Sequence, residues 1–223
     1  MALGEYLWAW SSITKWLYHL NWNSNDNSGN SNNGTSTNIT WIGGVLWSGK
    51  ASLNSSNSYI SIPNLWAIWT WDFSFSIILN TTETNTSVLL SKWPNKSSGT
   101  WWYISLISYW GTPNLLFAAN DGSGWSNSIN NTNAYNDWNP HFIKIWRKSW
   151  VLYYYYDWEL LGSVAFANSI PNTMPIVIWN FSYLNSTLYF WWSSDEFVYE
   201  NKLDSSEDIM REYTYKKWRF WIL

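Results

Sequence analysis

The sequence predicts an all-β fold, a sandwich of short strands, and three features of its 223 residues point that way. Apolar residues alternate with polar ones in short runs, as in Phe73 to Leu79. Turn-rich segments separate these runs at short spacing, which is typical of a β-sandwich. The length suits one such domain with a core of its own. We expect a lead-in segment at 1–13, one sandwich domain at 14–215 and a tail at 216–223.

The stretch from His141 to Ser163 shows the clearest strand pattern. It reads as a first strand that carries Ile143 and Ile145, a second at Val151 to Tyr156 and a third at Leu160 to Val164, separated by polar breaks. The alternation divides the side chains between two faces. The face expected to be buried carries Ile143, Ile145, Leu152, Tyr154 and Tyr156, and the face expected to be wet carries Lys144, Tyr153 and Tyr155. The second break, Asp157-Trp158, falls where a two-residue hairpin favours Asp-Gly, because both central residues need φ > 0.

The remaining strands follow in chain order, and two long polar loops interrupt them. The expected strands are 15–20, 39–42, 51–53, 59–62, 73–79, 87–91, 102–107, 114–119, 176–178, 188–190 and 196–199, and the loops are 21–38 and 120–139. Asp204 to Glu207 forms a plausible capping arrangement, with Ile209 and Tyr213 four residues apart. This predicts one short C-terminal helix at an edge of the sandwich.

The composition excludes several classes of function. The formal net charge is -3, from 12 Lys and Arg against 15 Asp and Glu, so the chain has no basic stripe for nucleic acid. Cysteine is absent, which removes disulfides and thiolate metal sites. No stretch approaches the roughly 20 apolar residues of a membrane span, and Met1 to Trp10 lacks the features of a secretion signal.

The order of the pieces resembles the laminin-G-like branch of the concanavalin A-like lectin and glucanase superfamily. The matching stretches are Leu17 to Leu20 with Asn25 to Asn30 and Asn33 to Thr35, Ser58 to Pro63, Asp72 to Ser76, His141 to Ile143, Tyr155 to Asp157 with Glu159 to Ser163, Ile176 to Ile178 before Asn180, and Asp195 to Val198. The resemblance implies a jelly-roll sandwich of two antiparallel sheets. It also implies a module of a secreted or surface protein that binds glycans or other surface ligands.

Tryptophan departs from that pattern. The chain has 23 Trp and only 11 Gly, and Trp22, Trp158, Trp179 and Trp192 stand where similar sequences carry glycine. Trp47, Trp66, Trp69 and Trp150 fall in turn-like settings as well. An indole at a φ > 0 position costs about 1–3 kcal/mol. One explanation is that many of these codons are UGA, read as glycine by the source organism. The alternative is a Trp-rich protein that stacks indoles on sugars, which predicts tryptophans clustered on one sheet face.

Catalytic constellations are poorly supported by the sequence. Asp157 with Glu159 would lie at a hairpin tip, and Asp195 with Glu196 would point to opposite faces, so neither is a good pair for glycoside hydrolysis. The two histidines, His19 and His141, lie beside strands and are expected to make structural hydrogen bonds. We therefore expect no enzyme activity.

The loop 21–38 predicts a calcium site. Asp26, Ser28 and Asn30 alternate in an oxygen-rich stretch, and calcium takes six to eight oxygen ligands. The resemblance suggests that Asp195 is brought against this loop and adds a carboxylate, so the expected metal ligands are Asp26, Asn30 and Asp195. The alternative is a loop of Asx turns without an ion.

The loop 120–139 is the candidate ligand site. Asn120 and Asp121 could hydrogen-bond sugar hydroxyls while the ring of Tyr135 stacks on the sugar, although a solvated loop without function would read the same way. Taken together, the chain is expected to be a non-catalytic carbohydrate-binding module, extracellular or at the cell surface, that takes a glycan or surface polysaccharide. A protein-adhesion or structural module of a larger surface or viral appendage protein is the second interpretation, and a glycoside hydrolase is the third.

Overall fold

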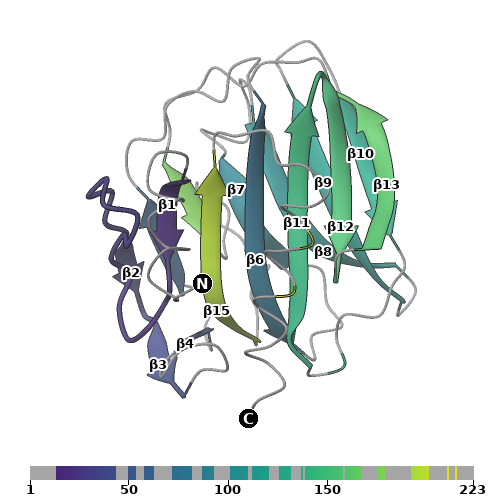
Figure 1. The fold of residues 1–223 in the computed structure, drawn as a ribbon. Coiled ribbons are helices and arrows are strands. Elements are labelled where there is room, and N and C mark those ends of the chain that lie inside the picture. Colours follow the sequence, from purple (N-terminus) through teal and green to yellow (C-terminus); the bar gives the residue numbers. More distant parts are fainter. Residues whose placement is uncertain are drawn as a thin grey trace.

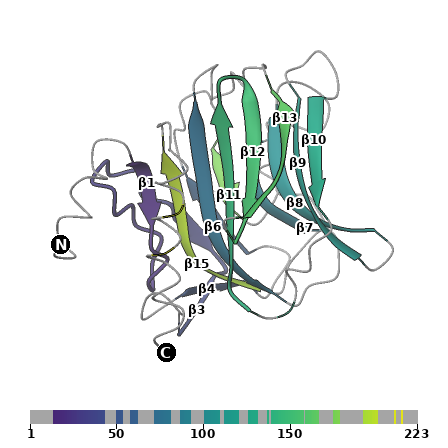
Figure 2. The same cartoon turned by 45° about the vertical axis from the view of Figure 1, so that its right-hand side comes forward.

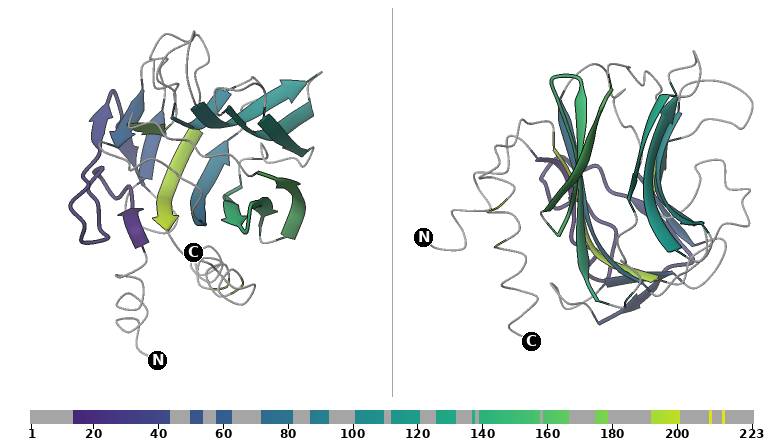
Figure 3. Two further views of the ribbon diagram at one scale, coloured as in Figure 1. Left: turned by 90° about the horizontal axis from the view of Figure 1, so that it is seen from above. Right: turned by 90° about the vertical axis from the view of Figure 1, so that its right-hand side faces the viewer.

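Two antiparallel sheets face each other in a computed structural model of the chain (Figures 1 and 3). It describes residues 14–43, 50–53, 58–62, 72–81, 87–92, 101–109, 112–120, 126–131, 137, 139–157, 159–166, 175–178, 192–200, 210 and 214. The expected all-β sandwich of two antiparallel sheets is confirmed.

The first sheet has eight strands and the second has seven. The first runs in the order β13 (Glu159–Ala165), β12 (Val151–Tyr156), β11 (His141–Lys148), β6 (Phe73–Thr81), β15 (Trp192–Glu200), β4 (Lys50–Leu53) and β3 (Thr40–Ile42), with β1 (Thr14–Tyr18) also paired to β15. The second runs in the order β10 (Ser126–Asn131), β9 (Thr112–Asn120), β8 (Trp101–Tyr109), β7 (Ser87–Lys92), β14 (Ile176–Ile178), β5 (Tyr59–Ile62) and β2 (Thr35–Thr37). Strands β6, β11 and β12 lie side by side in the first sheet (Figure 2).

Most strands lie where the sequence pattern predicts them. β5, β12 and β14 have the predicted bounds, and the others that were expected within the described residues differ by one to four residues at an end, the largest difference being the earlier start of β15. β2 and β10 lie inside the two segments that were expected to be loops. The predicted strand at 188–190 lies outside the described residues.

The predicted C-terminal helix is described at two positions only. Met210 and Thr214 are helical, and Thr214 Oγ1 donates a hydrogen bond of 2.7 Å to the carbonyl oxygen of Met210. The rest of the predicted helix, the lead-in segment 1–13 and the tail 216–223 lie outside the described residues.

The core lies between the sheets and follows the predicted alternation. β11 and β12 contribute Ile143, Ile145, Leu152, Tyr154 and Tyr156, all of them buried, as the sequence predicts. From β6 come Phe73, Phe75, Ile77 and Leu79, and from β14 come Ile176 and Ile178. Every second residue of these strands therefore points to the facing sheet.

The other face of the first sheet is not wet, which corrects the sequence-based expectation. Lys144 is 1 % exposed, and its Nζ lies 3.7 Å from Glu200 Oε2 on β15. Glu200 Oε2 also accepts a hydrogen bond of 3.3 Å from Ser74 Oγ. Because Phe142 and Trp146 are buried as well, the outer face is closed over β6, β11 and β15. The alternation therefore predicts correctly which side chains point to each face of the sheet, but the prediction that the outer face is exposed is wrong over β6, β11 and β15.

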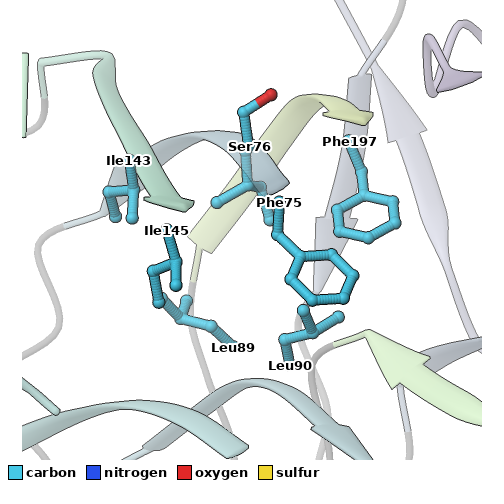
Figure 4. A pocket seen from close by; sticks show the side chains of 8 residues that line it. Phe75, Ser76, Leu89, Leu90, Ile143, Ile145 and Phe197 are labelled. Atoms are coloured by element: carbon cyan, nitrogen blue, oxygen red, sulfur yellow. The ribbon is translucent and has the colours of Figure 1, made fainter. Parts of the chain in front are cut away.

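A β-bulge in β7 shapes a small gap in the core. The pairing of β7 with β8 shifts between Val88 and Leu90, so Leu89 and Leu90 both point inward. Both line an apolar cavity of ≈ 10 Å³ together with side chains of β6, β11 and β15 (Figure 4). That volume is about the minimum for one water molecule.

Several turns adopt the left-handed backbone that favours glycine. Ser149 and Trp150, which join β11 to β12, have φ of 50° and 69°, Asp157 has 45°, and Trp22 has 64°. Trp192 is the first residue of β15. Trp47, Trp66, Trp69, Trp158 and Trp179 lie outside the described residues. Trp22 and Trp150 thus have the backbone conformation predicted for them.

Candidate functional site

The core cavity is far too small for a ligand. Ligand pockets usually have volumes of about 300–1,000 Å³, whereas the gap between the described parts of the two sheets is ≈ 10 Å³. This cavity is therefore not a ligand site.

An aromatic surface lies on the outer side of β11, β12 and β13, and we call it the outer tyrosine face. It consists of Trp146, Lys148, Tyr153, Tyr155 and Leu160. Cross-strand pairing builds it, because Trp146 lies opposite Tyr153 and Tyr155 lies opposite Leu160. Paired residues of an antiparallel ladder point to the same side.

The rings of this face contact one another. The Trp146 and Tyr153 ring centroids are 5.2 Å apart, and those of Trp146 and Tyr155 are 6.4 Å apart. Lys148 Nζ lies 5.0 Å from the centre of the Trp146 ring, a cation–π distance. Trp146 is buried, the two tyrosines are half-buried, and Leu160 is 49 % exposed. Buried Trp146 thus supports two tyrosines that reach the surface.

The outer tyrosine face offers the chemistry of a sugar platform. An aromatic ring presents an apolar face for the C–H groups of a sugar, and the tyrosine hydroxyl and the lysine ammonium can hydrogen-bond its oxygens. Sequence analysis placed Tyr153 and Tyr155 on this side but gave them no ligand role. The Tyr-x-Tyr alternation opposite a lysine-bearing strand is the signal that could have found it.

Asp26 organises the loop that was expected to bind calcium. Its Oδ1 accepts hydrogen bonds from the backbone nitrogens of Leu17 at 3.1 Å and Ser28 at 2.9 Å, and its Oδ2 accepts one from Asn32 at 3.0 Å. Asn30 donates through Nδ2 to Ser28 Oγ at 2.9 Å. The bond from Ser28 is an Asx turn, whereas the bonds from Leu17 and Asn32 join residues six or more positions from Asp26 in the sequence.

The structure describes the side chains of two of the three expected calcium ligands, Asp26 and Asn30. Asp195 lies in β15 near the end of β1, since Tyr18 pairs with Phe197, but its side chain is outside the description. Within the described residues, no group of three or more His, Asp or Glu side chains is arranged to hold a metal ion. Calcium binding by Asp26, Asn30 and Asp195 stays a prediction.

The expected ligand loop is described only in part. Asn120 is the last residue of β9 and pairs with Trp101. Asp121 and Tyr135 lie outside the described residues, and β10 occupies part of the segment that was expected to be a loop. The proposed sugar contacts of Asn120, Asp121 and Tyr135 stay predictions.

His141 is held between two carboxylates. Its Nδ1 lies 2.8 Å from Asp157 Oδ2 and its Nε2 lies 2.8 Å from Asp137 Oδ1. Tyr156 stacks on the ring at 4.9 Å and places its hydroxyl 2.6 Å from Nδ1. Burial opposes the charged imidazolium, but the bonds to Asp157 and Asp137 and their charges outweigh it and raise the pKa of His141. Two carboxylates on one ring favour the doubly protonated form.

These contacts are structural, as the sequence predicts for the histidines. Asp157 Oδ1 also accepts the backbone N–H of Phe142 at 2.8 Å, so Asp157 ties the end of β12 to the start of β11. His19 Nδ1 lies 3.2 Å from Glu196 Oε2. Asp157 and Glu196 are therefore each engaged with a histidine.

Known structures share this fold. The binding domain of Paraclostridial Mosquitocidal Protein 1 is similar at a TM-score of 0.75 with 16% identity, over 92% of this chain and 53% of that chain. The binding domain of botulinum neurotoxin serotype D is similar at a TM-score of 0.70 with 16% identity, over 92% of this chain and 52% of that chain. The ligand-binding domain of the same serotype, in complex with N-acetylneuraminic acid, is similar at a TM-score of 0.70 with 17% identity, over 94% of this chain and 52% of that chain.

These comparisons correct the laminin-G-like assignment. The chain shares its sandwich with toxin receptor-binding domains and spans about half of their length. No protein-family profile and no curated protein sequence matches it. The assignment was wrong because its matching pieces are short strands and turns, which many antiparallel sandwiches share.

Proposed function

We propose that the chain is a non-catalytic carbohydrate-binding module of a secreted or surface protein, and that the outer tyrosine face contacts the sugar. The half-buried pair Tyr153 and Tyr155 above buried Trp146 is the observation that carries the proposal. A platform held by the sheet loses little conformational freedom on binding.

The structural neighbours support a binding role of this kind. Their titles describe binding and receptor-binding domains, and one has N-acetylneuraminic acid bound. The same titles support a role outside catalysis and a secreted protein. No described helix is long and apolar enough to cross a membrane.

The rival role in protein adhesion calls for a wide exposed apolar face. The exposed large apolar side chains among the described residues are Trp22, Ile42, Trp150, Leu160 and Met210. They lie on separate loops, strands and the C-terminal segment rather than on one sheet face. Scattered single residues of this kind are normal on a protein surface, so these five give no specific support to adhesion.

A glycan-array screen tests the proposal. Wild type should bind a defined class of glycan, and Tyr153→Ala and Tyr155→Ala should each weaken that binding about tenfold, which corresponds to about 1.4 kcal/mol. Tyr153→Phe keeps the stacking ring and should retain most of the affinity. Tyr59→Ala removes a half-buried tyrosine from β5 of the other sheet and is the matched control.

Two results would contradict the proposal. A folded protein that binds no glycan on the array would favour the protein-adhesion role. Glycan binding that survives both alanine substitutions would retain the function and move the site away from the outer tyrosine face.

A further inference from the structure

Two tryptophans have a backbone that tryptophan rarely adopts. Among the described residues, Trp22 has φ of 64° and Trp150 has φ of 69°. In this left-handed region the Cβ atom of an L-residue crowds the following carbonyl oxygen, and glycine avoids the clash. Asn38 and Asp157, which also have positive φ, are types that tolerate this region. The remaining described non-glycine residues with positive φ are Leu20, Ser31 and Ser149.

The turn at Trp150 has the geometry of a glycine-containing hairpin. Lys148 pairs with Val151, so Ser149 and Trp150 form a two-residue connection in which both φ values are positive, 50° and 69°. That is the pattern of a type I′ turn, whose second central residue is most often glycine. Glycine at residue 150 would remove the strain at the second of these two positions.

The side chains of Trp22 and Trp150 lie largely at the surface. Their exposed fractions are 51 % and 45 %, so neither belongs to the core. The Trp150 ring does lie 5.0 Å from the Arg147 guanidinium carbon, but Phe166 lies at a similar distance, 5.3 Å. Trp146 differs from both, because it is 5 % exposed and lies inside β11.

We propose that residues 22 and 150 of the natural protein are glycine, encoded by UGA codons that the source organism reads as glycine. The excess of 23 Trp over 11 Gly follows from the same reading. With glycine at residues 22 and 150, the natural protein has no indole at these positions that could contact a sugar. Tyr153 and Tyr155 are unaffected by the reassignment.

The gene and the natural protein test the proposal directly. We expect UGA at codons 22 and 150, and peptide mass spectrometry of the protein from its source organism should show glycine at both positions. UGG at either codon, or a natural peptide with tryptophan at residue 22 or 150, would overturn the assignment for that residue.

Stability gives an independent test on recombinant protein. Trp22→Gly should raise the melting temperature by about 2–4 °C, the shift expected for relieving about 1 kcal/mol in a chain of this size. Trp150→Gly should raise it less, because Arg147 loses one of its two aromatic neighbours. Trp146→Gly is the matched control and should lower it, since a buried ring is removed from a strand. A lower melting temperature for Trp22→Gly than for the tryptophan protein would contradict the proposal.

Discussion

Asp26 shows how one side chain can organise a long loop. Three backbone N–H groups, those of Leu17, Ser28 and Asn32, converge on its carboxylate. A hydrogen bond to a charged group contributes about 1.5–3 kcal/mol, more than a neutral one. Asp26 therefore orders the loop 21–34 together with the hydrogen bonds that join Ser24 to Gly34.

Replacing Asp26 with alanine should lower the free energy of unfolding by about 2–4 kcal/mol, because three N–H groups lose their acceptor together. Urea denaturation followed by circular dichroism measures this. Asn25→Ala alters the exposed neighbouring side chain and should change stability by no more than about 0.5 kcal/mol. Equal effects of the two substitutions would mean that Asp26 does not organise the loop.

The cluster of His141, Asp137 and Asp157 should make stability depend on pH. The pKa of His141 is raised above its ordinary value of 6.5, so its contribution is complete below pH 6.5 and is lost as pH rises through the folded-state pKa. Burial opposes the charged form of Asp137, but hydrogen bonds from Asn139 and His141 and the charge of His141 lower its pKa below 3.8. The contribution of Asp137 is complete above pH 3.8 and is lost as pH falls through its folded-state pKa.

The cluster therefore stabilises the fold fully between pH 3.8 and 6.5. Thermal melting should be measured from about pH 3 to about pH 9, so that it covers both sides of this window. The melting temperature of wild type should decline above the window. His141→Gln cannot titrate and should flatten that decline. An unchanged pH profile in His141→Gln would show that His141 does not carry it.

At the scale of elements, the sequence predicts strands well where β-branched, aromatic and other apolar residues gather. β5, β12 and β14 are rich in such residues, and their predicted bounds are correct. β2 is Thr-Ser-Thr and β10 is Ser-Asn-Ser-Ile-Asn-Asn, so neither has an apolar period, and only pairing with β5 and β9 defines them. The outer tyrosine face was missed for a related reason, since its pairs across β11, β12 and β13 depend on register.

The bulge in β7 predicts an unusual sensitivity at two consecutive residues. Leu89 and Leu90 both contact the core, so Leu89→Ala and Leu90→Ala should each cost about 2–5 kcal/mol of unfolding free energy. In a regular strand only one of the two would do so. Leu160→Ala on the exposed edge should cost about 0.5 kcal/mol or less. Urea denaturation curves compare them, and a neutral result at Leu89 or Leu90 would argue against the bulge.

At the scale of the whole molecule, we keep calcium binding by Asp26, Asn30 and Asp195 as a proposal. Because Asp26 already accepts three N–H groups, an ion must share this carboxylate, and we expect a modest stabilisation of about 1 kcal/mol, or 2–4 °C, in excess calcium. Asp195→Asn should abolish the shift. Identical melting temperatures in calcium and in chelator would contradict calcium binding at these three residues.

The sandwich itself explains why a module of this kind binds at its surface. The two sheets pack through large apolar side chains, and the cavity beside Leu89 and Leu90 is too small for a ligand. A ligand then meets strand faces and loops. On the first sheet, the outer side is buried over β6, β11 and β15 and reaches the surface at Tyr153 and Tyr155.

Nuclear magnetic resonance with tyrosine-selective ring labelling tests the central claim most directly. As a glycan chosen from the array is titrated into the protein, the ring signals of Tyr153 and Tyr155 should shift together and saturate, while those of Tyr59 on the other sheet stay in place. Saturable binding with no change at Tyr153 and Tyr155 would contradict the claim that the outer tyrosine face holds the sugar.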